Sequence, residues 1–276
     1  MVNNHPLLHG PGRAVRDTLQ KMPGVTWDNG FEGALCVGAG AAELKLEHGE
    51  WLAFRLPLAE PSTPLEAVSE HRAASGNVRH AIFARRRVAM AETQLDGVVH
   101  LPHSVAGIAA GLRSLAEGLP LASPTDKPLA DLTDAIAGLP YGADDIVRID
   151  KVFELRLRVQ GKLSPVRVSP EVESARIERV VLDELPAGKA AEAIAYEALR
   201  INSALRLARL SIRRGQLIAE TRLHAQQLSA TWIQMGAVAV AVAAHYAHTP
   251  LTMLARNPAL VECYAELFLS RTAATQ

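Results

Sequence analysis

The sequence has only two cysteines among its 276 residues, Cys36 and Cys263. No C-x-x-C motif occurs, so neither a disulfide framework nor a zinc site built on paired cysteines is expected. Cys36 lies in an apolar stretch that predicts a strand. We expect its thiol to be buried and unreactive, because free cysteine is among the most buried residue types. The same expectation applies to Cys263.

Aromatic residues are also scarce, at 4% of the chain, and neither sign of charge is in excess. Lysine plus arginine equals aspartate plus glutamate, 29 each. This balance gives no reason to expect a nucleic acid or an anionic membrane as partner. The 49% of hydrophobic residues suffices for one large or two ordinary domains, with cores of Ala, Leu, Val and Ile.

No long hydrophobic run occurs. The most apolar stretch, Ala237–Ala244, is far shorter than the roughly 20 residues that span a bilayer. The amino-terminal residues lack the charged start and apolar core of a signal peptide. The sequence therefore predicts a cytoplasmic protein without membrane insertion.

The most informative feature of the sequence is an internal repeat. Residues 85–95, RRRVAMAETQL, align without a gap to residues 213–223, RRGQLIAETRL, and six of the eleven positions are identical. The constant offset of 128 residues indicates a tandem duplication. We predict a first repeat at 1–120, a proline-rich linker at 121–128 and a second repeat at 129–276.

The hydrophobic pattern predicts the same element order in each half. Strands show period-two alternation, clearest at Phe153–Val159. Helices are expected to follow the caps Thr63, Ser104 and Ser229 and to begin at Gly188. Each repeat is expected to run helix, three strands, helix, two strands, helix around an antiparallel sheet, which is an α+β class. The last long helix is predicted at 230–247. A further helix at 258–269 has no counterpart in the first half.

The element order resembles the type III secretion chaperone-like fold, which includes the YbjN-like domains. Leu199–Asn202 ends the middle helix where such domains often carry a Leu-x-x-Asn pattern, and the strands around Gly215 follow as in that fold. Asn77 stands near the matching site of the first half. The resemblance implies a protein that binds a segment of another protein, or another copy, and has no catalytic residues. Two fused repeats would then imitate a dimer.

Three histidines form the main candidate metal site. His100, His103 and His224 follow equivalent strands of the two repeats, which favours a helix cap but leaves a metal-dependent enzyme as an alternative. His245 and His248 share one face of the last long helix. We interpret them as residues of its final turn, where histidine suits the helix dipole. No cofactor is expected.

Two further motifs have simple structural interpretations. Gly38-Ala39-Gly40 resembles the start of a dinucleotide loop but precedes a strand, so we predict a tight turn. Glu92 and Glu220 recur in both repeats beside arginine pairs. We expect cross-strand ion pairs or edge-strand charges in preference to acid–base catalysis.

The favoured function is a non-enzymatic, chaperone- or adaptor-like module that holds a segment of a partner protein. The alternative is a structural or assembly subunit that forms homo-oligomers through the helix at 258–269. Long and aromatic side chains on strands and on the last long helix are the candidate contacts, because such side chains often anchor interfaces. These residues are Trp51, Phe54, Arg156, Arg158 and Trp232.

Overall fold

The chain folds into two compact units, each an α+β structure with a six-stranded antiparallel sheet. Unit 1 comprises Met1–Glu60 and Ala73–Leu121, and unit 2 comprises Pro61–Arg72 and Ala122–Gln276. The predicted linker at 121–128 lies outside the described residues. The structure, a computed structural model, describes residues 17–27, 32–47, 51–58, 63–69, 78–84, 86–94, 101–117, 132–171, 174–224 and 228–269.

The sheet of unit 1 has the strand order β1-β2-β3-β4-β6-β5. Along β3, Ala42, Leu44 and Leu46 are buried and alternate with exposed or half-buried residues, as the period-two pattern predicts. These side chains and Phe54 join a core to which α3 (Leu101–Glu117) adds Val105, Ile108 and Leu112. The strands are β1 (Val25–Trp27), β2 (Glu32–Val37), β3 (Gly40–Glu47), β4 (Trp51–Pro57), β5 (Arg79–Phe83) and β6 (Arg86–Gln94).

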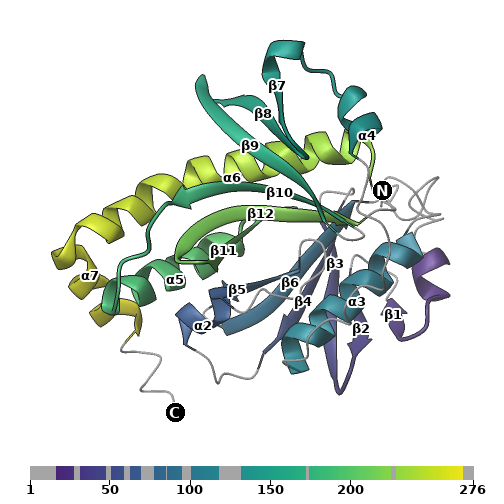
Figure 1. The fold of residues 1–276 in the computed structure, drawn as a ribbon. Coiled ribbons are helices and arrows are strands. Elements are labelled where there is room, and N and C mark those ends of the chain that lie inside the picture. Colours follow the sequence, from purple (N-terminus) through teal and green to yellow (C-terminus); the bar gives the residue numbers. More distant parts are fainter. Residues whose placement is uncertain are drawn as a thin grey trace, which may run out of the picture. The chain divides into compact units, whose positions relative to one another are not determined.

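Unit 2 repeats this topology, with the order β11-β12-β10-β9-β8-β7. Its strands are β7 (Ile146–Ile149), β8 (Val152–Val159), β9 (Lys162–Glu171), β10 (Ser174–Leu182), β11 (Arg209–Arg213) and β12 (Gln216–His224). Its helices are α2 (Pro64–Ser69), α4 (Thr133–Ala137), the 3-10 helix Ala143–Asp145, α5 (Lys189–Asn202), α6 (Ala230–Arg256), α7 (Pro258–Tyr264) and the π-helical turn Ala265–Leu269. Figure 1 shows α6 lying along one face of the sheet, where it packs on β10 and β12.

Four strands, and not the predicted three, precede the middle helix in each half of the sequence. The additional strands β1 and β7 have three and four residues and lie at a sheet edge. Segments this short contain too few residues to show an alternating pattern. The prediction of α+β units with antiparallel sheets is confirmed, and the predicted element order was wrong in this respect.

The helix α2 begins at the predicted cap, Thr63, which forms a capping box with Glu66. Glu66 N donates to Thr63 Oγ1 at 3.2 Å, and Thr63 N donates to Glu66 Oε2 at 2.8 Å. Although α2 comes from the first half of the sequence, it belongs to unit 2 and packs against α5 and β11. Leu65 N donates to Glu192 Oε2 of α5 at 3.1 Å.

The helix α6 begins at the predicted cap, because Trp232 N donates to Ser229 Oγ at 3.3 Å. It continues nine residues beyond its predicted end and contains Pro250. By length and composition it is capable of crossing a membrane, but ten of its residues are buried and it covers the unit 2 sheet. A core helix of a soluble α+β protein has the same properties.

The helix α3 begins at Leu101, three residues before the predicted cap Ser104. Ser104 is therefore part of the helix. Pro102 occupies the first turn, where a missing backbone N–H has no intrahelical partner to lose.

Candidate functional site

A buried arginine–glutamate pair recurs in both units. Arg79 donates two hydrogen bonds to Glu92, at 2.7 and 2.6 Å, and Arg209 Nε donates to Glu220 Oε1 at 3.0 Å. All four side chains are at least 95% buried. The predicted cross-strand ion pairs are confirmed, but their arginines lie five residues before the hairpin turn and not in the neighbouring pairs at 85–86 and 213–214. Ser211 Oγ also donates to Glu220 Oε1, at 3.0 Å.

Both carboxylates are buried against an arginine of their own unit, an arrangement typical of a structural ion pair. Burial alone would raise the pKa of the Glu220 carboxyl, but the charges of Arg209 and Arg222 and the hydrogen bonds from Arg209 and Ser211 bring that pKa below its ordinary value. A general base at neutral pH requires a carboxyl whose pKa is raised instead.

The candidate metal site of three histidines falls on side chains that the structure does not describe. His100 and the side chains of His103 and His224 lie outside the described residues. No group of three or more His, Cys, Asp or Glu that could hold a metal ion occurs among the residues that the structure describes.

Both cysteines are exposed, so the expectation of buried thiols was wrong. In β2, Leu35 and Val37 point into the core, and Cys36 between them takes the opposite face. The tight turn predicted at Gly38-Ala39 is present between β2 and β3, with Gly38 at a φ of +56°.

The predicted contact residues occupy different environments. Phe54 is completely buried in the core of unit 1 and therefore has no surface to offer a partner. Trp51 and Trp232 are half-buried, on β4 and in the first turn of α6. Arg156 and Arg158 are exposed on β8. That these four residues contact a partner protein stays a prediction.

The two exposed arginines lie on the face of the unit 2 sheet that points away from α6, which we call the outer face. Directly opposed residues share a face in an antiparallel sheet. One row therefore crosses five strands, from Glu154 through Arg167, Glu178 and Glu220 to Arg209.

Arginines outnumber carboxylates on the outer face. Glu171 accepts from Arg176 at 2.6 Å and lies 3.4 Å from Arg222, and Glu178 pairs with Arg213. Burial, more than any neighbouring charge, raises the pKa of Glu178. Toward β8, Arg156 lies 3.7 Å from Glu154, and Arg156, Arg158 and Arg167 are all exposed. Two apolar side chains, Leu163 and Val180, are exposed beside these arginines.

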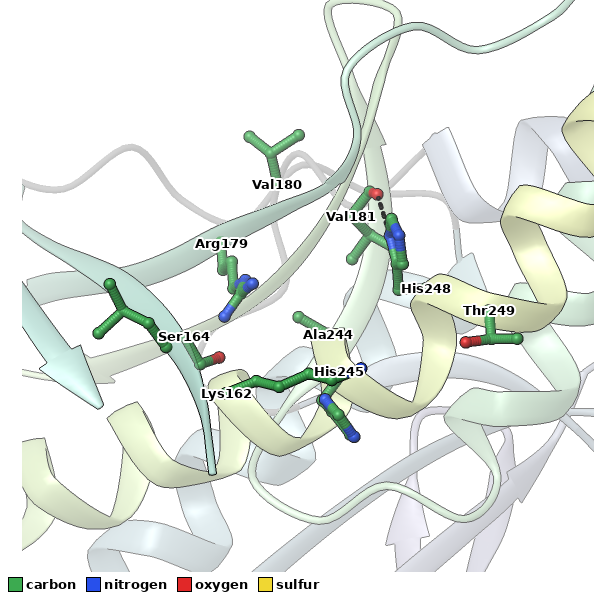
Figure 2. Close-up of a pocket in the computed structure, with 10 residues that line it drawn as sticks. Lys162, Ser164, Arg179, Val180, Val181, Ala244, His245, His248 and Thr249 are labelled. Atoms are coloured by element: carbon green, nitrogen blue, oxygen red, sulfur yellow. Dashed lines mark hydrogen bonds between the residues drawn. The ribbon is translucent and has the colours of Figure 1, made fainter. Parts of the chain in front are cut away.

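A cleft of about 270 Å³ lies on the opposite, α6-facing side, where β9 and β10 meet the middle of α6 (Figure 2). Its position follows from β10, in which Ala175, Ile177, Arg179 and Val181 share the face that α6 covers. Arg179 thus places a guanidinium in an otherwise apolar row. Burial lowers the pKa of Arg179. The other polar lining residues are Lys162, Ser164, His245, His248 and Thr249.

The two histidines of the cleft belong to the interior of α6. The interpretation that they mark its final turn was wrong, because the helix continues to Arg256. His248 Nδ1 lies 3.2 Å from the Val181 carbonyl oxygen, which accepts, so that Nδ1 carries the proton. His245 Nε2 lies 3.1 Å from Gln160 Oε1. Each histidine therefore has one ring nitrogen engaged by its neighbour and one remaining.

Sequence reasoning missed this cleft. The sequence of β10 contains a signal that could have indicated the cleft, because Arg179 lies on the same face of the alternating strand as Ala175, Ile177 and Val181. A charged residue at an inward position of an alternating strand indicates either a buried partner or a polar site.

Comparison with known proteins gives no functional assignment. The sequence matches no protein-family model and no curated protein. A solved structure, the di-domain ARO/CYC StfQ from the steffimycin biosynthetic pathway, aligns over 98% of this chain and 96% of its own at 11% identity. The TM-score of this alignment is 0.14, which is too low to support an argument about fold or function.

Proposed function

We propose that this chain is a non-enzymatic protein-binding module of the chaperone or adaptor type, located in the cytoplasm, that holds a segment of a partner protein. The resemblance to type III secretion chaperone-like and YbjN-like domains motivates the proposal. Two similar α+β units with the same strand order support it. In addition, α2 of the first half packs on α5, the helix at the equivalent place of the second half, as expected if a fused chain imitates a dimer.

The observation that carries the proposal is the part of the outer face formed by β8, β9 and the neighbouring residues of β10. Exposed arginines there flank the exposed apolar side chains Leu163 (53% exposed) and Val180 (37% exposed). Arginine and apolar groups together suit a segment with carboxylates and hydrophobic side chains, and charge complementarity sets the choice of partner. We infer that the bound segment is acidic and partly apolar.

Affinity capture from the native cell, with a charge-reversed variant, tests the proposal. The wild-type chain is expected to retain one stoichiometric companion, and the double variant Arg156→Glu, Arg158→Glu is expected to lose it at least about tenfold, because like charges oppose binding. The matched control, Lys21→Glu with Arg113→Glu, makes the same charge change at exposed positions of unit 1. Absence of any companion, or equal loss in both variants, would contradict the proposal.

The alternative of an assembly subunit rests on the helix at 258–269. Its aromatic side chains Tyr264 and Phe268 pack on Tyr196 of α5, with ring centroids 5.9 and 5.8 Å away. Leu267 of this segment (49% exposed) and Met253 near the end of α6 (54% exposed) are apolar groups that a second copy could contact. Light scattering of the full chain discriminates: a monomer at micromolar concentration rules the assembly function out.

A further inference from the structure

The cleft between the β9–β10 strands and α6 combines cationic groups with unused hydrogen-bond donors. Lys162, Arg179 and two histidines line it. Of the described residues that line the cleft, none carries a carboxylate. A group of positive charges beside a low-dielectric wall attracts anions when no carboxylate lines the same cleft, as is the case among the described lining residues.

Two polar atoms in this cleft are buried without a partner. Ser164 is 2% exposed, and its hydroxyl makes no hydrogen bond to the part of the chain that the structure describes. Arg179 Nη1 is likewise buried and makes none. A buried donor without a partner carries a desolvation penalty, so such atoms in native structures indicate a ligand or ordered solvent. Figure 2 shows Arg179 directed toward α6, whereas Val180 points away from it.

We propose that this cleft binds a phosphate group, either as inorganic phosphate or as part of a small phosphomonoester. Phosphate accepts hydrogen bonds on several oxygens at once, which matches a guanidinium, a hydroxyl and an ammonium supplied from different elements. The Thr249 hydroxyl provides a further donor along α6. The cavity of about 270 Å³ is at the small end of ligand sites, which limits the ligand to a few non-hydrogen atoms beyond the phosphate.

The charged groups of this site and those of the proposed partner surface lie on opposite faces of the sheet, although Leu163 and Val180 also line the cleft. Arg179 and Ser164 face α6, whereas Arg156 and Arg158 belong to the outer face of the same sheet. Anion binding by the purified chain therefore needs no partner protein, and its failure would leave the partner-binding proposal unaffected.

Isothermal titration of the purified full-length chain tests this site directly. Inorganic phosphate, glycerol 3-phosphate and acetate are titrated separately at constant ionic strength. Saturable binding of phosphate is expected with acetate at least about tenfold weaker, because a carboxylate has fewer oxygens to engage the donors. Glycerol 3-phosphate binding at least about tenfold tighter than phosphate would identify the phosphomonoester as the ligand, and equal affinities would identify free phosphate.

Three variants locate the site. Arg179→Met is expected to weaken phosphate binding at least about tenfold, and Ser164→Ala and Lys162→Ala several-fold each. The control Arg156→Met, an arginine on the outer face, should leave the affinity unchanged. Ser164→Ala removes a hydroxyl that has no partner among the described residues, so the fold should be unharmed. If Arg179→Met does not fold, Ser164→Ala and Lys162→Ala test whether the cleft binds phosphate.

Three results would each overturn the proposal. The first is the absence of saturation with either phosphate ligand up to about 10 mM, at which concentration binding would be no stronger than that of nonspecific charges. The second is acetate binding as tight as that of phosphate. The third is an equal loss of affinity in Arg156→Met and in the cleft variants, which would show that net charge and not this cleft attracts the ligand.

Discussion

At the residue scale, the recurrence of a buried arginine–glutamate pair is the closest correspondence between the two units. In unit 2, Arg209 lies directly opposite Glu220, whereas in unit 1 Arg79 lies opposite Met90 and reaches Glu92 two residues further along β6. Positions two apart share a face, so the long arginine side chain spans the difference. The pair therefore persists although the register of the two hairpins differs.

Removing the carboxylate from a pair should destabilise its unit strongly. Glu220→Gln removes the carboxylate that the buried guanidinium of Arg209 contacts directly, and we expect the free energy of unfolding to fall by about 3–5 kcal/mol. Glu92→Gln should act similarly on unit 1. Urea denaturation followed by circular dichroism measures both. The control Glu117→Gln breaks the exposed pair with Arg113 and should cost less than about 1 kcal/mol. A loss this small in Glu220→Gln would show that the buried pair is not needed.

The effect of Glu220→Gln should also depend on pH. The pKa of Glu220 is lower in the folded protein than in the unfolded chain, so its contribution is complete above the unfolded value of about 4.3 and is lost as the pH falls through the folded value. The difference in unfolding free energy between wild type and Glu220→Gln should therefore shrink as the pH is lowered below about 4. Urea titrations at pH 7, 4 and 3 measure it. A difference that grows toward acid pH would contradict the assigned direction.

At the element scale, α6 depends on small residues for its close approach to the sheet. Gly236 is buried, and a Cβ atom there would lie 2.8 Å from Ile177 Cδ1 and 3.2 Å from Thr221 Cγ2. Both distances are shorter than ordinary van der Waals contact. Ile177 is itself completely buried and has little room to move.

Two glycine-to-alanine substitutions separate packing from helix propensity. Gly236→Ala should lower the free energy of unfolding by about 1 kcal/mol, because overpacking outweighs the propensity gain. Gly107→Ala is the matched control in α3, where nothing lies within 4 Å of the added Cβ, and it should stabilise by about 0.5–1 kcal/mol. Chemical denaturation of both variants gives the comparison. Stabilisation by both substitutions would show that α6 has room at Gly236.

At the scale of the whole molecule, α2 lies in the first half of the sequence but belongs to unit 2. Ala67 and Val68 of this helix are completely buried, and the helix packs on α5 and β11 within unit 2. A segment of the first half therefore completes the second unit. The two halves of the sequence are not two independent folding units.

Truncating Val68 should weaken elements more than 100 residues away in the sequence. We expect Val68→Ala to lower the free energy of unfolding by about 1–2 kcal/mol through the lost apolar contact. Amide hydrogen exchange should show reduced protection in α5 and β11. Leu52→Ala, in β4 of unit 1, is the control and should reduce protection in the unit 1 sheet first. Unchanged exchange in α5 with Val68→Ala would mean that α2 contributes little to unit 2.

The sequence by itself determined the local structure of this protein. Alternation in β3 and β8, the caps at Thr63 and Ser229, and the turn at Arg214-Gly215 are all present in the structure. Each of these signals is complete within about ten residues, because backbone preference, capping and the facing of side chains are local properties. Such local signals did not predict the very short edge strands or the continuation of α6 through Pro250.

The tertiary structure alone decided which distant side chains meet. It paired Glu92 and Glu220 with Arg79 and Arg209, and it brought Arg179 of β10 to the cleft beside α6. It also exposed Cys36 and completely buried Phe54, although both lie in apolar strands. Local periodicity fixes the face on which a residue lies, but what covers that face depends on strand order and helix packing between segments far apart in the chain.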